Sequence, residues 1–194
     1  MAKSIEYLDV LNESGEKTGE IKPKDDIHRD GDWHKSVHVW VLNSKNELLI
    51  QRRAACKENY PNQWDISVAG HLSAGDTSLY AAVREFREEL GLLLSQEEFA
   101  HLFVCQQNAV LNNGTYFERL INDVYLLRKD IDLSAVRLQK EEVAEVKYIL
   151  WPELEKNIRE ENPEYVRRPM EFEKLFAWLR ENAISFEKYN IAEG

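Results

Sequence analysis

Three glutamates in the middle of the chain have the spacing of a metal site. Glu85, Glu88 and Glu89 stand at i, i+3 and i+4, and a helix places residues with this spacing on one face. At about 100° per residue, the three carboxylates fall within an arc of roughly 100°. Like charges at these positions repel one another, whereas clustered carboxylate oxygens suit a hard cation. The spacing therefore predicts a site for Mg²⁺ or Mn²⁺ on a helix.

The same segment supplies a separate apolar face. We expect a helix over residues 77–90, because apolar side chains recur there at the helical period, about a third of a turn from the glutamates. These side chains are Leu79, Ala82, Val83, Phe86 and Leu90. Gly91 follows at the position where a glycine commonly ends a helix. One face of this helix is thus predicted to pack against the core while another presents the carboxylates.

The segment around these glutamates resembles the Nudix box. It reads GHLSAGDTSLYAAVREFREELGL and follows the pattern G-x5-E-x7-R-E-U-x-E-E-x-G-U, in which U is a bulky apolar residue. One position departs: the first glutamate of the pattern is Asp76 here, whose short side chain suits the start of a helix. The resemblance implies an α/β fold, a Nudix α/β/α sandwich with a mixed β-sheet. It also implies that Glu85, Glu88 and Glu89, with the Gly70 carbonyl, hold the catalytic metal.

Further site residues follow from this resemblance. Arg84 is expected to orient the glutamates rather than to bind substrate. The segment that contacts the diphosphate in the family is basic, and here it contains Arg52, Arg53 and Lys57. Ordinary surface charge at a strand end is the alternative for these three residues. Nudix enzymes often place an additional glutamate in a loop before the last strand, so Glu141 and Glu142 are candidates for the general base, with solvated loop charge as the alternative.

The sequence on both sides of the box resembles type I isopentenyl-diphosphate isomerases, over roughly residues 25–150. In these isomerases, three histidines and two carboxylates build a metal site. The histidine positions fall at, or within about a residue of, His28, His34 and His71. Of the two carboxylate positions, one holds Ile121 and the other Asp123. The resemblance therefore implies either a second metal site or histidines that contact the substrate, His71 among them.

Ala69 decides between isomerisation and hydrolysis. The isomerases carry a cysteine at this position, and moving a double bond requires one group that protonates a carbon and another that deprotonates its neighbour. Hydrolysis requires a cation on the phosphate oxygens and a water held in line. We therefore predict a metal-dependent Nudix pyrophosphohydrolase that cleaves a small organic diphosphate, nucleoside-linked or otherwise. The alternatives are isopentenyl-diphosphate delta-isomerase and a non-catalytic regulatory module that binds a phosphorylated metabolite.

The rest of the chain predicts strands interleaved with helices. Apolar runs bounded by turn residues predict strands, and prolines at helix starts predict two C-terminal helices. The expected strands are 7–12, 17–22, 35–42, 47–53, 64–69, 102–111, 115–127 and 146–151, and the expected helices are 152–160 and 169–182. Asn113 and Gly114 predict the turn of a long hairpin. We expect residues 1–194 to form a single Nudix domain, with a core over about 30–165, an N-terminal hairpin and C-terminal helices.

Composition and charge narrow the class of protein. The chain has 194 residues, 43% of them hydrophobic, and a formal net charge of −10. This charge disfavours nucleic acid as a partner, and no apolar run is long enough for a membrane span. Cys56 and Cys105 are isolated, which favours a reducing, cytoplasmic setting. The expected partner is a small-molecule diphosphate, a homodimer is the family expectation, and the leaving group stays open because specificity lies outside the box.

Overall fold

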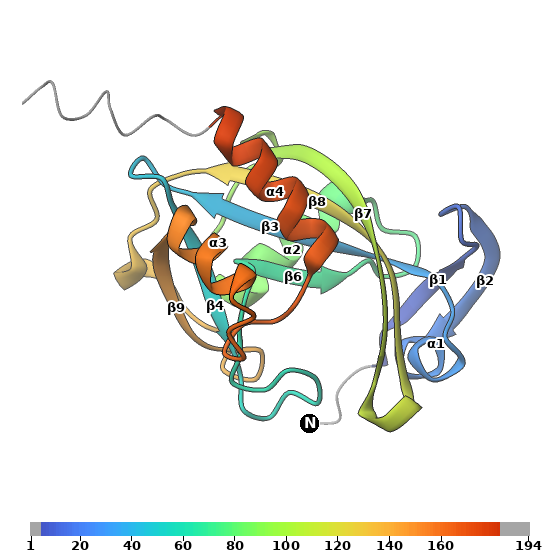
Figure 1. Cartoon of the computed structure of the whole chain (residues 1–194). Coiled ribbons are helices and arrows are strands. Elements are labelled where there is room, and N and C mark those ends of the chain that lie inside the picture. The colour runs from blue at the N-terminus through green and yellow to red at the C-terminus, as the bar shows by residue number, and fades with distance from the viewer. Residues whose placement is uncertain (1–4, 183–194) are drawn as a thin grey trace, which may run out of the picture.

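Strand β3 (His34–Leu42) is the centre of the main sheet in the computed structural model, which describes residues 5–182. It pairs in parallel with β8 (Tyr116–Arg128), and antiparallel with both β6 (Val68–His71) and β4 (Glu47–Arg53). Antiparallel pairing adds β7 (Phe99–Leu111) beside β8, and adds β5 (Trp64–Asp65) and β9 (Val143–Leu150) beside β4. Together these strands form one seven-stranded mixed sheet (Figure 1).

Helices lie on both faces of this sheet. Helix α2 (Ser78–Leu90) covers one face, and α3 (Trp151–Arg159) and α4 (Pro169–Asn182) cover the other (Figure 1). The predicted α/β/α sandwich with a mixed sheet is therefore confirmed. No helix within residues 5–182 has both the length and the apolar character needed to cross a membrane.

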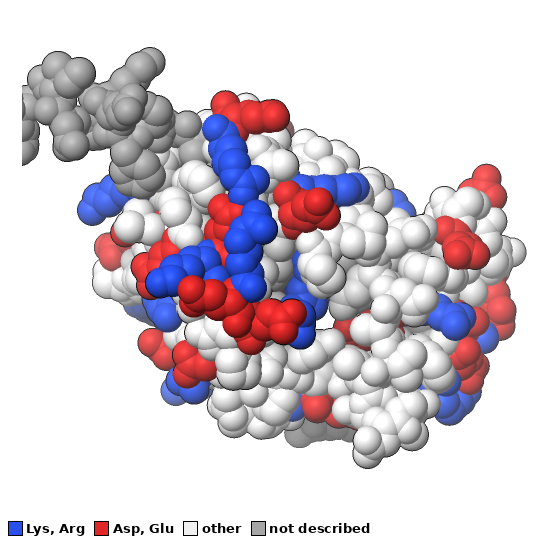
Figure 2. All heavy atoms as spheres, in the orientation of Figure 1, with Lys and Arg blue, Asp and Glu red and all other residues white. Residues whose placement is uncertain are grey.

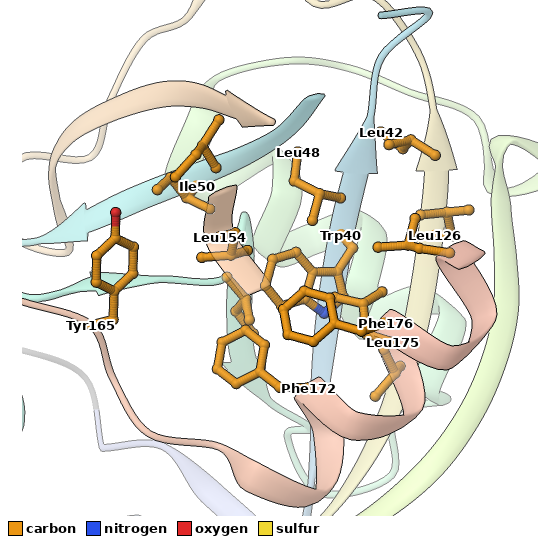
Figure 3. Packing of buried hydrophobic residues seen from close by; sticks show 14 of the residues in the cluster. Trp40, Leu42, Leu48, Ile50, Leu126, Leu154, Tyr165, Phe172, Leu175 and Phe176 are labelled. Carbon is orange, nitrogen blue, oxygen red and sulfur yellow. The ribbon is translucent and has the colours of Figure 1, made fainter. Parts of the chain in front are cut away.

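Alternation along β3 builds a core on each side of the sheet. Val37, Val39 and Val41 pack in the cluster beneath α2, while Trp40 and its neighbours pack beneath α4. Figure 3 shows Trp40 among aromatic side chains of α4, with the rings of Trp40 and Phe172 centred 5.8 Å apart. Strands buried on both faces read as continuous apolar runs. The same alternation places Ser36 and His38 on the α4 face, and His38 Nδ1 contacts Glu171 of α4 at 2.6 Å.

The N-terminal part forms a separate two-stranded sheet. β1 (Tyr7–Leu11) and β2 (Lys17–Pro23) pair antiparallel, so the predicted hairpin is confirmed. A short helix, α1 (Lys24–Asp30), follows and ends at Gly31, whose φ of 76° is left-handed. This helix was not predicted, because seven residues span only about two turns and offer too little periodicity. Its position matters below, since it carries one of the candidate histidines.

The single strand expected over residues 64–69 is wrong. The structure has two strands here, β5 and β6, separated by Ile66 and Ser67. The Ser67 hydroxyl donates to the carbonyl oxygen of Leu49 at 2.5 Å and accepts from the Val41 amide at 2.9 Å. A side chain thus takes the place of backbone ladder bonds, and the chain crosses from pairing with β4 to pairing with β3.

The remaining elements follow the prediction with shifted ends. The long hairpin turns at Asn112–Gly114, and β7 begins at Phe99, three residues before the expected start. β9 likewise begins earlier than expected, and α3 begins at Trp151. The α3–α4 surface is densely charged: Figure 2 shows basic and acidic side chains interleaved there, and Glu155 pairs with both Arg159 and Arg180.

Candidate active site

Helix α2 begins and ends as its local sequence dictates. Thr77 is the N-cap, and its Oγ1 accepts a hydrogen bond from the Tyr80 amide at 3.3 Å. At the other end Gly91 adopts φ 71°, and its amide donates to the Arg87 carbonyl. Asp76 is therefore not the cap. These ends fix which turn of the helix faces β6.

The three glutamates of α2 lie at different depths. The side chain of Glu85 is 12% exposed and that of Glu88 49% exposed, while Glu89 is buried. Burial raises the pKa of Glu85 to about 7 despite the nearby Arg84. Burial, and then the charge of Glu85, also raise the pKa of Glu89 well above its ordinary value. The described residues therefore do not supply enough positive charge to balance the buried carboxylates of Glu85 and Glu89.

Gly70 makes the closest approach between β6 and the glutamates. A Cβ atom at Gly70 would lie 2.0 Å from Cδ of Glu85 and 2.3 Å from its Oε1. No real Cβ tolerates such contacts, so only glycine lets the Glu85 carboxylate sit against the strand. The close approach places the Gly70 backbone beside the carboxylates, as the resemblance implied.

Arg84 connects the helix to the end of β6. Its guanidinium donates to Glu85 Oε1 at 2.8 Å and to the His71 carbonyl oxygen at 2.9 Å. It also lies 3.5 Å from Glu88 and 3.8 Å from Asp76. A guanidinium with four oxygen neighbours is held firmly in place. This geometry supports the predicted orienting role of Arg84.

Three side chains from other segments act on Glu89, one by a hydrogen bond and two through their charges. Gln51, on β4, donates from Nε2 to Glu89 Oε2 at 3.0 Å. Lys57 and Glu142 form an ion pair, and their charges shift the pKa of Glu89 in opposite directions, Glu142 upward and Lys57 downward. Glu142 therefore lies near enough to Glu89 for their charges to repel each other. Glu141 is exposed, and its carbonyl oxygen accepts from the Cys56 thiol.

The two neighbouring arginines of β4 diverge. Arg52 donates to the Asn62 carbonyl oxygen at 3.0 Å, and its guanidinium lies 6.0 Å from the ring centre of Trp64, which belongs to the core cluster beneath α4. Arg53 donates to the Asn59 carbonyl oxygen at 3.1 Å. Its side chain is 17% exposed. A bulge at this point lets consecutive residues depart from strict alternation.

Three histidines from distant segments converge on the other side of β6. His28, His34 and His71 have ring nitrogens within 4.8 Å of one another, and their buried Nε2 atoms have no hydrogen-bond partner among the described residues. Nδ1 of His28 lies 2.9 Å from the Phe117 carbonyl oxygen, and Nδ1 of His34 lies 3.0 Å from that of Asp32. Because a carbonyl only accepts, these Nδ1 atoms carry the proton and Nε2 keeps its lone pair.

Burial holds these histidines in the neutral form. It lowers the pKa of His34 to about 3, and it lowers the pKa of His28 and His71 below the ordinary value as well. Neutral imidazoles with converging lone pairs are metal ligands. The fold thus brings together the three histidines that the resemblance to the isomerases assigned to one site.

Comparison with models of known protein families shows which family this chain belongs to and which motif contains α2. The family model of the NUDIX domain matches residues 32–169. This chain belongs to the Nudix family. Helix α2 with Gly70 is its Nudix box, and the carboxylates described above are the Nudix glutamates.

Relatives support this assignment over most of the chain. Nudix hydrolase 3 of Arabidopsis thaliana is 47% identical over 181 residues, 91% of this chain but 23% of that protein, so this chain spans less than a quarter of the Arabidopsis relative. An uncharacterized Nudix hydrolase of Listeria monocytogenes is 38% identical over 151 residues, 78% of this chain and 83% of that protein. The chain is thus a member of an enzyme family, as predicted.

Two further comparisons concern the fold and the branch of the Nudix family that is similar to the isomerases. The crystal structure of DR0079 from Deinococcus radiodurans has a TM-score of 0.66 at 25% identity, covering 92% of this chain and 100% of that one. An isopentenyl-diphosphate delta-isomerase of Escherichia coli is 33% identical over 93 residues, 48% of this chain and 51% of that protein. The predicted similarity to the isomerase branch of the Nudix family is confirmed.

Asp123 does not join the histidines, and its predicted place among the ligands is wrong. It lies beside Val37 in the parallel pairing of β3 and β8, and such neighbours point to the same face of a sheet. His34, three residues before Val37, points to the other face. Asp123 instead pairs with Lys35 Nζ at 3.0 Å. The register of β8 against β3 decides this, and the sequence alone does not provide it.

Lys24 and Glu6 form an ion pair whose charges act on both clusters, and sequence reasoning missed both. Lys24 Nζ is 2.9 Å from Glu6 Oε2. The charge of Lys24 adds to burial in lowering the pKa of His28, His34 and His71. Glu6, in turn, adds to burial in raising the pKa of Glu85. Neither residue belongs to a spaced motif, so only the packing of α1 and the N-terminal segment reveals them.

Proposed function

We propose that this Nudix protein is a divalent-metal-dependent hydrolase that cleaves the P–O–P linkage of a small organic diphosphate. The observation that carries the proposal is the carboxylate face of α2, with Glu85 and Glu89 withdrawn from solvent and Glu88 open to it. Buried like charges destabilise one another unless a counter-charge is supplied. A cation at this face would supply it.

The donor set fits a hard cation, and we propose Mg²⁺ or Mn²⁺. Carboxylate oxygens and a backbone carbonyl are the ligands that these ions prefer. Glu85, Glu88 and Glu89, with the Gly70 carbonyl, would hold the ion, and Glu85 reaches this position only because residue 70 has no Cβ. When bound, the ion supplies charge neutralisation on the phosphate oxygens and a more acidic water.

The chain's own residues would perform the rest of the reaction. Arg53 lies at the start of the 54–63 loop and Lys57 lies within it, and both would bind the phosphate oxygens through charge-assisted hydrogen bonds. Arg84 keeps Glu85 in place. Glu89 and Glu142 are the candidates for accepting the proton of the attacking water, because their carboxylates are near enough to interact. The exposed Glu141 is the weaker candidate for the base.

Phosphate release from a panel of diphosphates would test this function. The panel contains nucleoside diphosphate sugars, dinucleotides, thiamine diphosphate and prenyl diphosphates, each assayed with Mg²⁺ and with Mn²⁺. We expect turnover of at least one class, and a loss of about 10²–10³-fold in Glu89→Gln and Glu88→Gln, because these groups act on charge that develops in the reaction. The exposed Glu97→Gln should retain full activity.

Other outcomes would point to the alternatives. Full activity in the Glu88 and Glu89 variants would refute the site assignment. Tight binding without turnover over the whole panel would favour a binding module. Conversion of isopentenyl diphosphate to its isomer would favour the isomerase, although Ala69 provides only a methyl group where the isomerases have a cysteine.

We also propose that the histidine cluster is a second, transition-metal site. Three neutral imidazoles whose Nε2 atoms converge without a protein partner among the described residues match the nitrogen ligands of zinc-type sites. The carbonyl oxygens of Phe117 and Asp32 orient two of the rings, as outer hydrogen bonds do in metal sites. The competing hypothesis is that these histidines contact the substrate.

Metal analysis would separate the two hypotheses. Protein purified without a histidine tag should carry about one transition-metal ion per chain, and the His34→Ala/His71→Ala variant should lose it. His101→Ala, on an exposed residue of β7, should retain the ion. Metal-free wild-type protein that takes up no added Zn²⁺ or Mn²⁺ at this site would exclude the second metal.

A further inference from the structure

Two arginines contact one buried carboxylate at unequal distances. The Asp65 side chain is 1% exposed. Arg168 donates to it through two parallel bonds, Nε to Oδ1 at 2.9 Å and Nη2 to Oδ2 at 2.8 Å. Arg53 reaches only Oδ2, from Nη1, at 3.4 Å. Arg168 therefore holds Asp65 in the stronger, bidentate geometry, and Arg53 makes a long single contact.

Asp65 has little capacity left for a second strong partner. Its Oδ1 also accepts from the Ile66 amide at 2.9 Å. Burial alone would raise the pKa of Asp65, but Arg168 and then Arg53 hold it well below its ordinary value. The carboxylate is thus ionised and already satisfied on both oxygens. Without Arg168, a buried charge would remain, and Arg53 is the cation in position to neutralise it.

Arg168 is also anchored through the nitrogen that does not contact Asp65. Its Nη1 donates to Gln107 Oε1 at 2.8 Å, and Gln107 Nε2 donates to Glu118 Oε2 at 2.5 Å. Arg168 directly precedes α4, whose first turn also carries Glu171, bonded to Trp40 Nε1 at 2.9 Å. The docking of α4 on the sheet therefore sets the position of the Arg168 guanidinium.

Arg53 is held at only one end of its guanidinium. Nε donates to the Asn59 carbonyl oxygen at 3.1 Å, and Nη1 makes the long contact with Asp65. Among the described residues, none accepts a hydrogen bond from Nη2. The side chain is 17% exposed, at the base of the loop that carries Lys57. Its remaining donors are thus available to an oxygen-rich ligand.

We propose that Arg168 is a positioning residue: by occupying Asp65 it prevents that carboxylate from capturing Arg53, and so leaves the Arg53 guanidinium free to bind a phosphate group of the substrate. This inference rests on the proposed function for the identity of the ligand. It assigns the C-terminal helix a part in substrate binding, through a residue that does not touch the substrate.

A double mutant tests the competition directly. In Arg168→Met, Arg53 should turn to Asp65, and KM for the best diphosphate of the panel should rise about tenfold with kcat within about twofold, which is the pattern of lost uniform binding. In Asp65→Asn/Arg168→Met the capturing charge is gone, so KM should return to within about threefold of wild type. Arg167→Met, next in the chain and exposed, is the matched control.

Arg53→Met completes the cycle. It should raise KM in wild type and add little in the Arg168→Met background, because Arg53 is already withdrawn there. An unchanged KM in Arg168→Met, or a KM that stays raised in the double mutant, would overturn the proposal, since a purely structural role predicts no rescue. Should Arg168→Met not fold, Arg168→Lys replaces it: lysine keeps the charge beside Asp65 but not the two parallel bonds, so KM should rise to a smaller extent, and an unchanged KM would overturn the proposal.

Binding of inorganic diphosphate separates this proposal from the proposed function. Titration calorimetry with inorganic diphosphate and Mg²⁺ measures the same contacts without turnover. Weaker binding in Arg168→Met with recovery in the double mutant supports the positioning role even if no diphosphate is hydrolysed. Hydrolysis by wild type with binding that is insensitive to Arg168 refutes the positioning role and leaves the hydrolase intact.

Discussion

At the scale of single residues, the site depends on the absence of one carbon atom. An added Cβ at Gly70 would lie 2.0 Å from Cδ of Glu85, so the carboxylate and the strand can approach only when residue 70 is glycine. The pattern in the sequence contained this glycine. The reason for it became visible only when β6 was packed against α2.

Gly70→Ala should therefore impair activity more than stability. We expect the Glu85 carboxylate to be displaced by about an ångström, turnover to fall about 10²-fold, and the free energy of unfolding to fall by about 1–3 kcal/mol through overpacking. Steady-state assays and urea denaturation measure the two effects. Gly75→Ala is the control, since its Cβ meets no atom within 4 Å and only its φ of 87° is strained; equal turnover losses in both would contradict the explanation.

Gln51 should hold the Glu89 carboxylate in place through a hydrogen bond. Gln51→Leu removes the 3.0 Å hydrogen bond to Glu89 Oε2, and hydrogen bonds to charged groups are worth about 1.5–3 kcal/mol. We expect weaker binding of Mn²⁺, by about tenfold, and a parallel loss of turnover. Electron paramagnetic resonance of Mn²⁺ measures the affinity. Gln63→Leu should leave it unchanged, and an unchanged affinity in Gln51→Leu would show that Gln51 only fills space.

At the scale of elements, α4 is fixed to the sheet by buried polar contacts as well as by its apolar face. Glu171 contacts His38 Nδ1 at 2.6 Å and Trp40 Nε1 at 2.9 Å, and Asp65 holds Arg168 at the start of the helix. Pro169 was enough to predict the start of the helix. The partners of its charged residues, more than a hundred positions away, were not predictable.

Asp65→Asn should lower stability in a pH-dependent way. Removing this carboxylate leaves Arg168 unpaired in the interior, which costs about 3–5 kcal/mol near pH 7. Because the pKa of Asp65 is lowered on folding from 3.8, its stabilisation is present above about pH 4 and is lost as pH falls towards the lower value of the folded state. Urea denaturation at pH 7, 5 and 3 should show the difference between wild type and variant shrinking only at the lowest pH.

The exposed Asp25→Asn is the control for this pH series. It should match wild type at every pH, because Asp25 lies on the surface of α1. A difference between wild type and Asp65→Asn that is independent of pH would contradict the assignment of the stabilisation to the ionised carboxylate.

At the scale of the whole molecule, we propose that residues 1–194 unfold as one domain. The helices on both sides pack against the same main sheet. Residues of β3 contribute to the core on both faces of this sheet. Calorimetry should therefore give a single transition whose calorimetric and van't Hoff enthalpies agree. Two separated transitions would show that the β1–β2 sheet or the C-terminal helices form an independent unit. The homodimer stays a prediction, which sedimentation equilibrium would test.

The sequence by itself determined the features that depend on local spacing. The glutamate face of α2, its apolar face, the glycine after it and most strands follow from periods of 3.6 and 2 residues. Local spacing failed where a tertiary contact replaced a local one, as at Ser67, whose hydroxyl breaks a continuous strand. It also missed α1, which is too short to have a period.

Only the tertiary structure decided which distant residues share a site. Parallel pairing of β3 with β8 removed Asp123 from the histidine cluster, and the packing of α1 brought His28 to His34 and His71. Because α4 docks on the sheet, Asp65 makes its short hydrogen bonds with Arg168 and only a long one with Arg53. Such choices are set by strand register and by competition between contacts far apart in the chain, and a period along the sequence contains information about neither.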